Sequence, residues 1–271
     1  MIKQAIIPLA GLGTRLLPLT SVFAKELLPI NGKPGLEYIL DECIEAGIKE
    51  VIFIISKKKM MIKKYFYNDK FYKDIIKKKG DPKIIKEYKK ILKYKKMIKF
   101  VFQDKPLGTG DAVYKTKKFI TDKYFLMLLP DDLIIKKNCS KSMILVHKKF
   151  KASVMASMKV NKSDVTRWGI YNIKKKIDKN NFIINNVVEK PSIKTSPSNY
   201  AVIGRYILPK TIFSKLKSLK PGKSGEFHIT DAIQALIEDD HQFIGHNFSG
   251  KYLDCGTMNG YIKSTLEISK Q

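Results

Sequence analysis

A short glycine-containing segment near the start of the chain carries residue types that hold phosphate groups. Gly11 and Gly13 are separated by one leucine, and glycines at this spacing let main-chain N–H groups approach an anion closely. Arg15 and Lys25 add two cations ten residues apart. A dinucleotide-binding loop would need a third glycine where Leu16 stands, and the Gly-Lys-Ser/Thr of a P-loop is missing too. The segment therefore favours a site that holds the β- and γ-phosphates of a polyphosphate while the α-phosphate reacts.

Two adjacent aspartates, Asp131 and Asp132, follow the apolar run Tyr124–Leu129. A carboxylate at the carboxyl end of a strand is well placed to hold Mg²⁺, which takes few protein carboxylates and completes its shell with phosphate and water. On spacing alone either aspartate could be the ligand, and a helix cap or a turn is the structural alternative.

The elements that must position these residues indicate an α/β fold. Largely apolar runs alternate with helical patterns, which predicts a Rossmann-like, mostly parallel sheet flanked by helices. Ligands of such sheets lie at the carboxyl ends of the strands. The predicted strands are Ile6–Ala10, Val51–Ile55, Ile98–Phe102 and Tyr124–Leu129, and the predicted helices run from Pro34 to Gly47 and over Gly108–Lys118.

The pattern loosens after residue 150, where short strand candidates are separated by turn-rich stretches. We expect this second half to be a β-rich, substrate-facing extension that continues the same sheet. Its predicted strands are Ser153–Val160, Gly169–Ile173, Phe182–Val188 and Tyr200–Leu208, and helical spacing recurs over Ile229–Ile237 and Met258–Leu266.

The formal charge of +27 over 271 residues is almost entirely due to lysine. Arg15, Arg167 and Arg205 are the only arginines among the 52 basic residues, whereas proteins that read nucleic acids favour arginine. The segment Lys57–Lys99 holds 18 lysines and four acids, with apolar residues at helical spacing. We interpret it as a solvated helical excursion and expect no nucleic-acid partner. A basic surface that binds RNA is the alternative.

The remaining composition excludes several classes of protein. Three widely spaced cysteines support neither a disulfide framework nor a zinc site. No apolar stretch approaches the roughly 18–20 residues that cross a bilayer, and the start of the chain lacks a signal-peptide pattern. We therefore expect a cytoplasmic protein without a membrane partner.

The complete set of motifs resembles the sugar nucleotidyltransferases, which join a nucleoside triphosphate to a sugar-1-phosphate. Within that family the chain is most similar to the bacterial UTP–glucose-1-phosphate uridylyltransferases (UDP-glucose pyrophosphorylases), from Ile2 to about Ile268. The run Ala-Gly-Leu-Gly-Thr-Arg from Ala10 and the run Lys-Glu-Leu-Leu-Pro from Lys25 match the uridylyltransferase form. Thymidylyltransferases usually begin Gly-Gly-x-Gly-Thr-Arg and carry Lys-Gln.

The resemblance implies a nucleotide-diphospho-sugar transferase fold, Mg²⁺ as cofactor, UTP and glucose-1-phosphate as substrates, and a homo-oligomer (dimer or tetramer). It divides the chain into a nucleotide-binding half, residues 1–150 with the excursion 57–99, and a sugar-phosphate-binding half, residues 151–271. The implied roles are as follows: nucleotide binding by Ala10, Gly11, Gly13, Gln103 and Gly108; catalysis by Arg15, Lys25 and Lys190; sugar-phosphate binding by Gly169, Glu189, Lys190, Val202 and Gly204; and metal binding by Asp131 and Asp254.

Three departures from the family pattern and three alternatives stay open at this level. Ala24 replaces the usual proline before Lys25, in the segment that we call the lysine loop, and Asp111 stands where histidine is common. The sequence ends at Gln271, about one helix earlier than many members of the family. A thymidylyl-, cytidylyl- or guanylyltransferase is the first alternative, and the nucleic-acid binder is the second. A catalytically silent relative is the third, and the intact set of charged motif residues argues against it.

Overall fold

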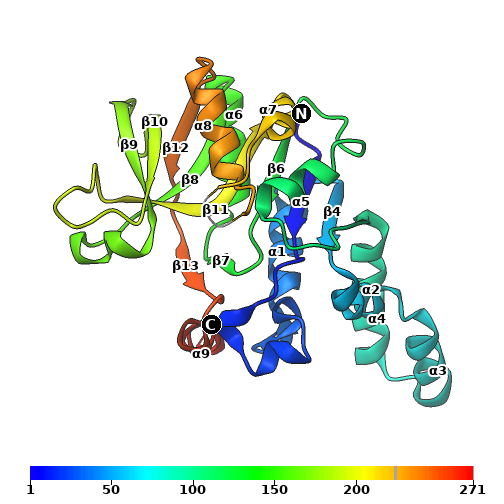
Figure 1. The fold of residues 1–271 in the computed structure, drawn as a ribbon. Helices are drawn as coiled ribbons and strands as arrows, with labels where there is room; N and C mark the ends of the chain where they lie inside the picture. The colour runs from blue at the N-terminus through cyan, green and yellow to red at the C-terminus, as the bar shows by residue number, and fades with distance from the viewer. Residues whose placement is uncertain (223–224, 271) are drawn as a thin grey trace.

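A nine-stranded sheet runs through the computed structural model, which describes residues 1–222 and 225–270 (Figure 1). The strand order is β5-β4-β1-β6-β11-β8-β12-β10-β9. These strands are β1 (Gln4–Pro8), β4 (Glu50–Ile55), β5 (Ile98–Phe102), β6 (Tyr124–Leu128), β8 (Ser153–Lys159), β9 (Gly169–Lys176), β10 (Asn181–Glu189), β11 (Tyr200–Pro209) and β12 (Phe243–Asn247).

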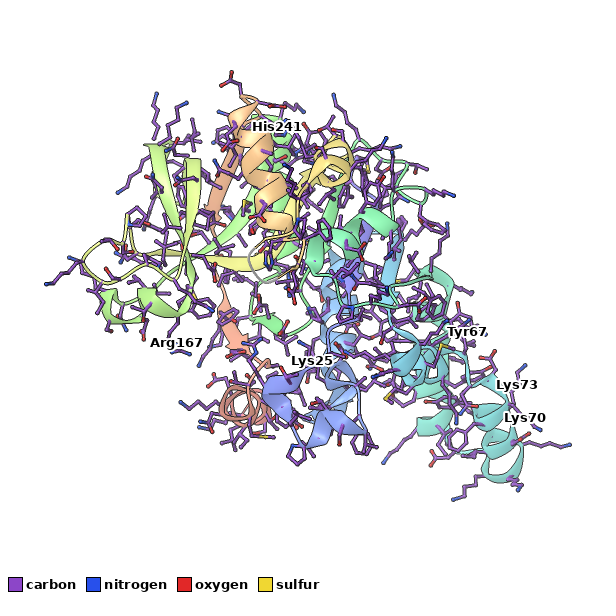
Figure 2. All side chains as sticks on the ribbon, viewed as in Figure 1. Lys25, Tyr67, Lys70, Lys73, Arg167 and His241 are labelled. Carbon is purple, nitrogen blue, oxygen red and sulfur yellow. The ribbon has the colours of Figure 1, made fainter. Side chains whose placement is uncertain are left out.

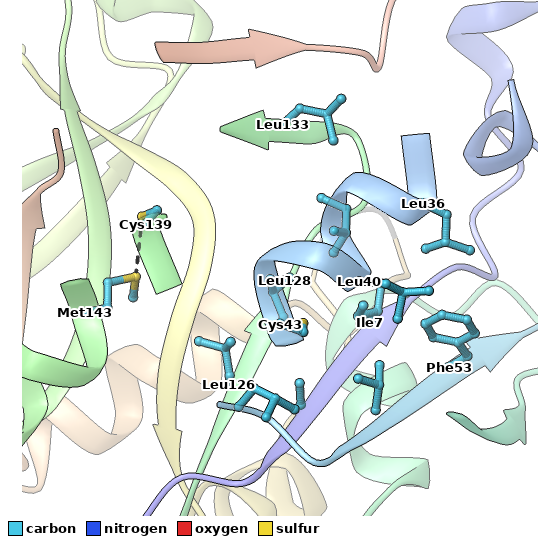
Figure 3. Packing of buried hydrophobic residues seen from close by; sticks show 14 of the residues in the cluster. Ile7, Leu36, Leu40, Cys43, Phe53, Leu126, Leu128, Leu133, Cys139 and Met143 are labelled. Atoms are coloured by element: carbon cyan, nitrogen blue, oxygen red, sulfur yellow. Dashed lines mark hydrogen bonds between the residues drawn. The ribbon is translucent and has the colours of Figure 1, made fainter. Parts of the chain in front are cut away.

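The first four strands of that order are parallel, as their largely apolar sequences predict. Alternate residues of each strand face opposite sides of the sheet. Ile7 and Phe53 pack with Leu40 of α1 (Gly35–Glu45) on one side (Figure 3). Ile6 packs with Val113 of α5 (Thr109–Lys115) on the other side. Both faces of this half are therefore covered, which leaves the strand ends as the place for a ligand.

The predicted helix over Gly108–Lys118 is shorter in the structure and ends at Lys115. The main-chain N–H and the hydroxyl of Thr116 both donate to the carbonyl of Val113, at 3.0 and 2.6 Å. A threonine that bonds back to the preceding turn competes with the helical pattern. The other predicted strands and helices are confirmed to within a few residues.

The second half continues the same sheet but is mainly antiparallel. Strand β11 lies between β6 and β8 and is antiparallel to both, and only β8–β12 is a parallel pair among the described strands of this half. The predicted parallel order thus holds for the first four strands. The division at residue 150 stays a prediction, since one sheet spans it.

The end of the chain returns to the first half. Strand β13 (Lys251–Asp254) pairs with β7 (Asp132–Ile135). Helix α9 (Met258–Ser269) lies next to β2 (Pro29–Ile30), where the Tyr261 hydroxyl donates to the Pro29 carbonyl at 2.5 Å. This return places residues that are more than a hundred positions apart beside one another.

The lysine-rich segment forms the expected helical excursion. Helices α2 (Met60–Tyr67), α3 (Asp69–Lys79) and α4 (Pro82–Met97) project from the β5 side of the sheet (Figure 1). Helix α4 is anchored by buried Ile91 and Tyr94, whereas Lys70 and Lys73 on α3 lie at the outer end (Figure 2). The remaining helices are α6 (Cys139–Phe150), α7 (Ile212–Ser218) and α8 (Ile229–Glu238). None of the described helices is both long and apolar enough to cross a membrane.

Candidate active site

A cleft of about 480 Å³ opens where β1, β5 and β6 end. The loops that follow these three parallel strands supply most of its walls, as expected for an α/β sheet. Seven residues that the sequence assigned to the nucleotide, catalysis or metal line it together: Ala10, Gly11, Gly13, Lys25, Gln103, Gly108 and Asp131.

The glycine loop is open toward this cleft and fixed on its other side. A Cβ atom on Gly11 would meet no atom within 4 Å, so the main chain there is accessible. Gly13 has a φ of +71°, a conformation that favours glycine. Its carbonyl accepts a 2.8 Å hydrogen bond from the Thr20 hydroxyl. The loop can therefore present main-chain N–H groups without a side chain in the way.

Gly108, which also lines the cleft, is a glycine because its main chain packs closely against Phe227. Its φ is +95°, and a Cβ atom would lie 2.5 Å from the carbonyl oxygen of Phe227. The Phe227 N–H donates to Leu107 at 2.8 Å, and its carbonyl accepts from Gly110 at 2.7 Å. The neighbouring Glu226 lines the cleft. Glu226 was not predicted from the sequence, because it lies in no recognisable motif.

Lys25 and Asp131 form the charged centre of the cleft. Lys25 Nζ lies 2.8 Å from Asp131 Oδ2, and Arg15 Nη2 lies 3.5 Å from the same oxygen. Burial alone would lower the pKa of Lys25, but Asp131 raises it on balance. Burial alone would raise the pKa of Asp131, but Lys25 holds it below its ordinary value. Both groups therefore stay charged, and Lys25 places a positive charge in the wall of the cleft. Arg15 is not among the residues that line the cleft, and its 67% exposed side chain lies beside Asp131.

Asp254 reaches this centre from the other end of the chain. A Cβ atom on Gly256 would lie 2.8 Å from Asp131 Oδ2, 3.2 Å from Asp254 Oδ1 and 3.1 Å from Arg15 Nη2. Both carboxylates thus face one small space that only a glycine leaves open. Asp254 Oδ1 also accepts a hydrogen bond from the Gly256 N–H at 2.8 Å, and its Oδ2 accepts one from the Thr257 hydroxyl at 3.3 Å. A pair of neighbouring carboxylates fits Mg²⁺, which uses one or two protein carboxylates beside phosphate. No cluster of three or more His, Cys, Asp or Glu side chains suited to a metal occurs in residues 1–222 and 225–270.

Asp132, the competing candidate, has a different environment from Asp131. Its Oδ2 accepts from the Gly204 N–H at 2.8 Å and its Oδ1 from the Tyr252 hydroxyl at 2.7 Å. Burial, reinforced by the charge of Asp131, raises its pKa to about 6. Both oxygens of Asp132 are thus used inside the protein, whereas Asp131 lines the cleft.

Arg205 fixes the main chain that carries both aspartates. This fully buried side chain grips Glu42 through Nε and Nη2, at 2.8–3.1 Å, and donates to three main-chain carbonyls. Those carbonyls belong to Leu129, Gly204 and Asp132, at 3.1, 3.0 and 2.6 Å. Five N–H donors in a planar fork reach acceptors that one ammonium could not span. The sequence shows Arg205 as one of three arginines but gives no signal for this role.

A second buried ion pair lies behind the lysine loop. Lys59 Nζ is 2.7 Å from Glu26 Oε1 and 2.9 Å from Oε2, and both side chains are buried. The pair ties the residue next to Lys25 to the start of the lysine-rich segment. Ala24, which departs from the family pattern, is also buried there and its N–H donates to the Met61 sulfur at 3.1 Å. A proline would lack that N–H.

The sugar-phosphate candidates gather at the ends of β9, β10 and β11, outside the cleft. A Cβ atom on Gly169 would lie 3.0 Å from Glu189 Oε2 and 3.6 Å from Val202 Cγ2, so these three residues are neighbours. The Lys190 N–H donates to the Trp168 carbonyl at 2.9 Å. The Lys190 side chain is 64% exposed and lies 4.0 Å from Glu189.

Trp168 connects this group to the metal candidates. It packs edge-on against Tyr252, with 5.5 Å between ring centroids, and lines a hollow of about 620 Å³ together with Asp254. Asp131 and Asp254 therefore stand between the cleft and this hollow, one lining each.

Neighbouring residues of the protein itself require the small size of Gly204. A Cβ atom there would lie 2.4 Å from Asp132 Oδ2 and 2.6 Å from Leu129 Cβ. The close approach at Gly204 is thus made by the loop after β6.

Comparisons with known proteins identify the family of this chain. The nucleotidyl transferase family matches residues 4–271. The chain is 37% identical over 269 residues to UTP–glucose-1-phosphate uridylyltransferase 2 of Staphylococcus saprophyticus, covering 99% of this chain and 92% of that protein. It is 35% identical over 271 residues to the UTP–glucose-1-phosphate uridylyltransferase of Bacillus subtilis, covering 100% and 92%.

Solved structures give the same result. A UDP-glucose pyrophosphorylase complexed with UDP-glucose matches with a TM-score of 0.87 at 33% identity, over 100% of this chain and 99% of that one. A UTP-bound enzyme from Acinetobacter baumannii matches with a TM-score of 0.89 at 31% identity, over 99% and 93%. The fold is that of these enzymes, and the chain belongs to the nucleotidyl transferase family.

Proposed function

We propose that this protein is a UTP–glucose-1-phosphate uridylyltransferase, which forms UDP-glucose and pyrophosphate. The observation that carries the proposal is the convergence of the open glycine loop, Lys25 and Asp131 on one cleft at the strand ends. Relatives that align over 99–100% of this chain and carry this activity by name support it. The phosphate-binding loop and the paired carboxylates favour nucleotidyl transfer over nucleic-acid binding, and the lysine-rich segment contains no arginine.

The reaction is an in-line attack by a phosphate oxygen of glucose-1-phosphate on the α-phosphorus of UTP. That oxygen is already ionised at neutral pH, so the site needs no general base. No histidine or cysteine is among the described residues that line the cleft. The protein must instead bring two anions together and stabilise the more crowded phosphorus.

Each charged residue has a part in that task. The main chain around Gly11 and Gly13 holds the triphosphate, and Arg15 and Lys25 place positive charge beside it. Asp131 and Asp254 would hold Mg²⁺, which when bound neutralises phosphate charge. Lys190 positions the sugar phosphate and Glu189 accepts hydrogen bonds from the glucose hydroxyls. A cytoplasmic homo-oligomer remains part of the proposal.

A pyrophosphate-release assay over UTP, dTTP, CTP and GTP with several sugar phosphates tests the substrate assignment. We expect UTP with glucose-1-phosphate to give the highest kcat/KM. A preference for dTTP or for another sugar phosphate would replace this assignment by a related transferase.

The metal assignment is tested in the same assay over a Mg²⁺ titration. Asp131→Asn and Asp254→Asn should each lower kcat by about 10²–10³, the usual loss when one charge-stabilising contact is removed. Asp74→Asn, which changes an exposed aspartate on α3, is the matched control and should retain wild-type turnover. Near-normal activity of Asp131→Asn at low Mg²⁺ would contradict the metal role.

A further inference from the structure

Gln103 is held in one orientation by two groups that can only accept hydrogen bonds. Its Nε2 donates to the Asp111 carboxylate at 2.8 Å and to the Gly108 carbonyl at 3.0 Å. Neither a carboxylate at neutral pH nor a carbonyl has a proton to donate. The NH₂ group of the amide must therefore face Asp111 and Gly108, and a flipped amide would set oxygen against oxygen at both positions.

This orientation determines what the amide offers to a ligand. Gln103 lies in the wall of the cleft and is nearly buried, with 4% of its surface exposed. With both amide hydrogens engaged behind it, Oε1 is the atom left to face the cleft. An amide that could otherwise donate or accept is thereby restricted to accepting.

Asp111 is itself well placed for this task. It lies in the first turn of α5, where a negative charge is favourable. Its second oxygen, Oδ1, is 3.6 Å from Lys115 Nζ, one helical turn further on. The carboxylate is thus held between a helix start and a cation while it orients Gln103.

We propose that Asp111 is a specificity-determining positioning residue, which keeps Gln103 Oε1 facing the base and so selects a base with a hydrogen at N3. This inference rests on the proposed function, because it assumes that the base lies against Gln103. Uracil carries N3–H and can donate to Oε1. Cytosine has a lone pair at N3, which Oε1 repels when the phosphates and ribose fix the pose of the base.

The test compares UTP with CTP for the wild-type protein, Asp111→Asn and Asp111→Ala. Asparagine has the same shape but can donate to Oε1, so it allows the flipped amide, and alanine removes one orienting bond. We expect the wild-type protein to prefer UTP by at least about a hundredfold in kcat/KM. Both variants should lower the UTP to CTP ratio about tenfold, as expected for the loss of one orienting hydrogen bond.

Asp104→Asn is the charge-matched control, since Asp104 is exposed and next to Gln103 in sequence. It removes the same negative charge near the nucleotide without touching the amide, and should leave the ratio within about twofold. Because Asp111→Asn is isosteric, it remains informative if the alanine variant is unstable. Thermal unfolding of each variant establishes that the proteins compared are folded.

Calorimetric binding of UTP and of CTP separates this inference from the proposed function. One outcome supports the positioning role and rejects the proposed function. In that outcome the wild-type protein binds UTP more tightly than CTP, the Asp111 variants lose this preference, and no UDP-glucose forms in the assay. If UDP-glucose forms but both Asp111 variants keep the wild-type ratio, the positioning role is wrong. A wild-type protein without preference for UTP over CTP overturns it as well.

Discussion

Replacing Arg205 by lysine tests whether the buried guanidinium fixes the segment from Leu129 to Asp132, which we call the aspartate loop. All five of its N–H donors are used by the Glu42 carboxylate and by the carbonyls of Leu129, Gly204 and Asp132. A lysine ammonium has three donors at one point, so at least two hydrogen bonds are lost. A buried acceptor left without a partner costs about 1–3 kcal/mol, which gives a destabilisation of about 2–6 kcal/mol for Arg205→Lys.

The assay is urea-induced unfolding of the full chain, followed by circular dichroism. Arg167→Lys is the control, because Arg167 is 66% exposed and its guanidinium lies 3.8 Å from Asp164. It should change the free energy of unfolding by less than about 0.5 kcal/mol. Turnover is measured on the same protein samples. Arg205→Lys should also lower kcat, because loss of the hydrogen bond to the Leu129 carbonyl loosens the main chain that positions Asp131, two residues further on.

A double variant separates the loss of the pair from an uncompensated charge. Arg205→Met leaves the Glu42 carboxylate buried without its cation, which commonly costs about 3–5 kcal/mol. Glu42→Gln combined with Arg205→Met removes both charges and should recover at least about 1 kcal/mol of that loss. A loss under about 1 kcal/mol in Arg205→Lys, or a double variant no more stable than Arg205→Met, would refute this reasoning.

Further predictions concern the sugar side, the second ion pair and acid stability. Lys190→Ala should reduce kcat/KM for glucose-1-phosphate about 10–100-fold with little effect on the KM for UTP, as expected for a lost charged hydrogen bond. Lys194→Ala is the exposed control, and equal losses in both variants would remove the assigned role. Lys59→Met leaves Glu26 buried and unpaired, so unfolding experiments should show a loss of about 3–5 kcal/mol. Burial lowers the pKa of His147, so its neutral form contributes stability that is complete above about pH 6.5 and is lost as pH falls through the lowered pKa. The free energy of unfolding of the wild-type protein minus that of His147→Gln isolates this residue from Asp132, whose pKa is raised to about 6. Urea unfolding should show that this difference falls between pH 7.5 and 5.5.

Local patterns in the sequence were sufficient to predict the elements and the phosphate-binding loop. The apolar runs of β1, β4 and β6 are almost entirely buried, so their composition alone identifies them, whereas the edge strand β5 exposes Lys99 and Phe102. The spacing of Gly11 and Gly13 predicts a loop with exposed main-chain N–H groups, because only glycine leaves that main chain uncovered. These features depend on neighbours along the chain, which a single sequence displays directly.

Only the tertiary structure decided which of the charged residues meet. The sequence could not distinguish the roles of Asp131 and Asp132. In the structure, the hydroxyl of Tyr252, which is 120 positions away in sequence, donates a hydrogen bond to Asp132. Lys59 is one lysine among many in sequence, and only its burial against Glu26 gives it a role. Insertion of β11 between β6 and β8 brings Arg205 to the aspartate loop, and the return of β13 brings Asp254 to Asp131. Such pairings depend on sheet order and chain return, which arise from packing of the whole molecule and leave no periodic signal in the local sequence.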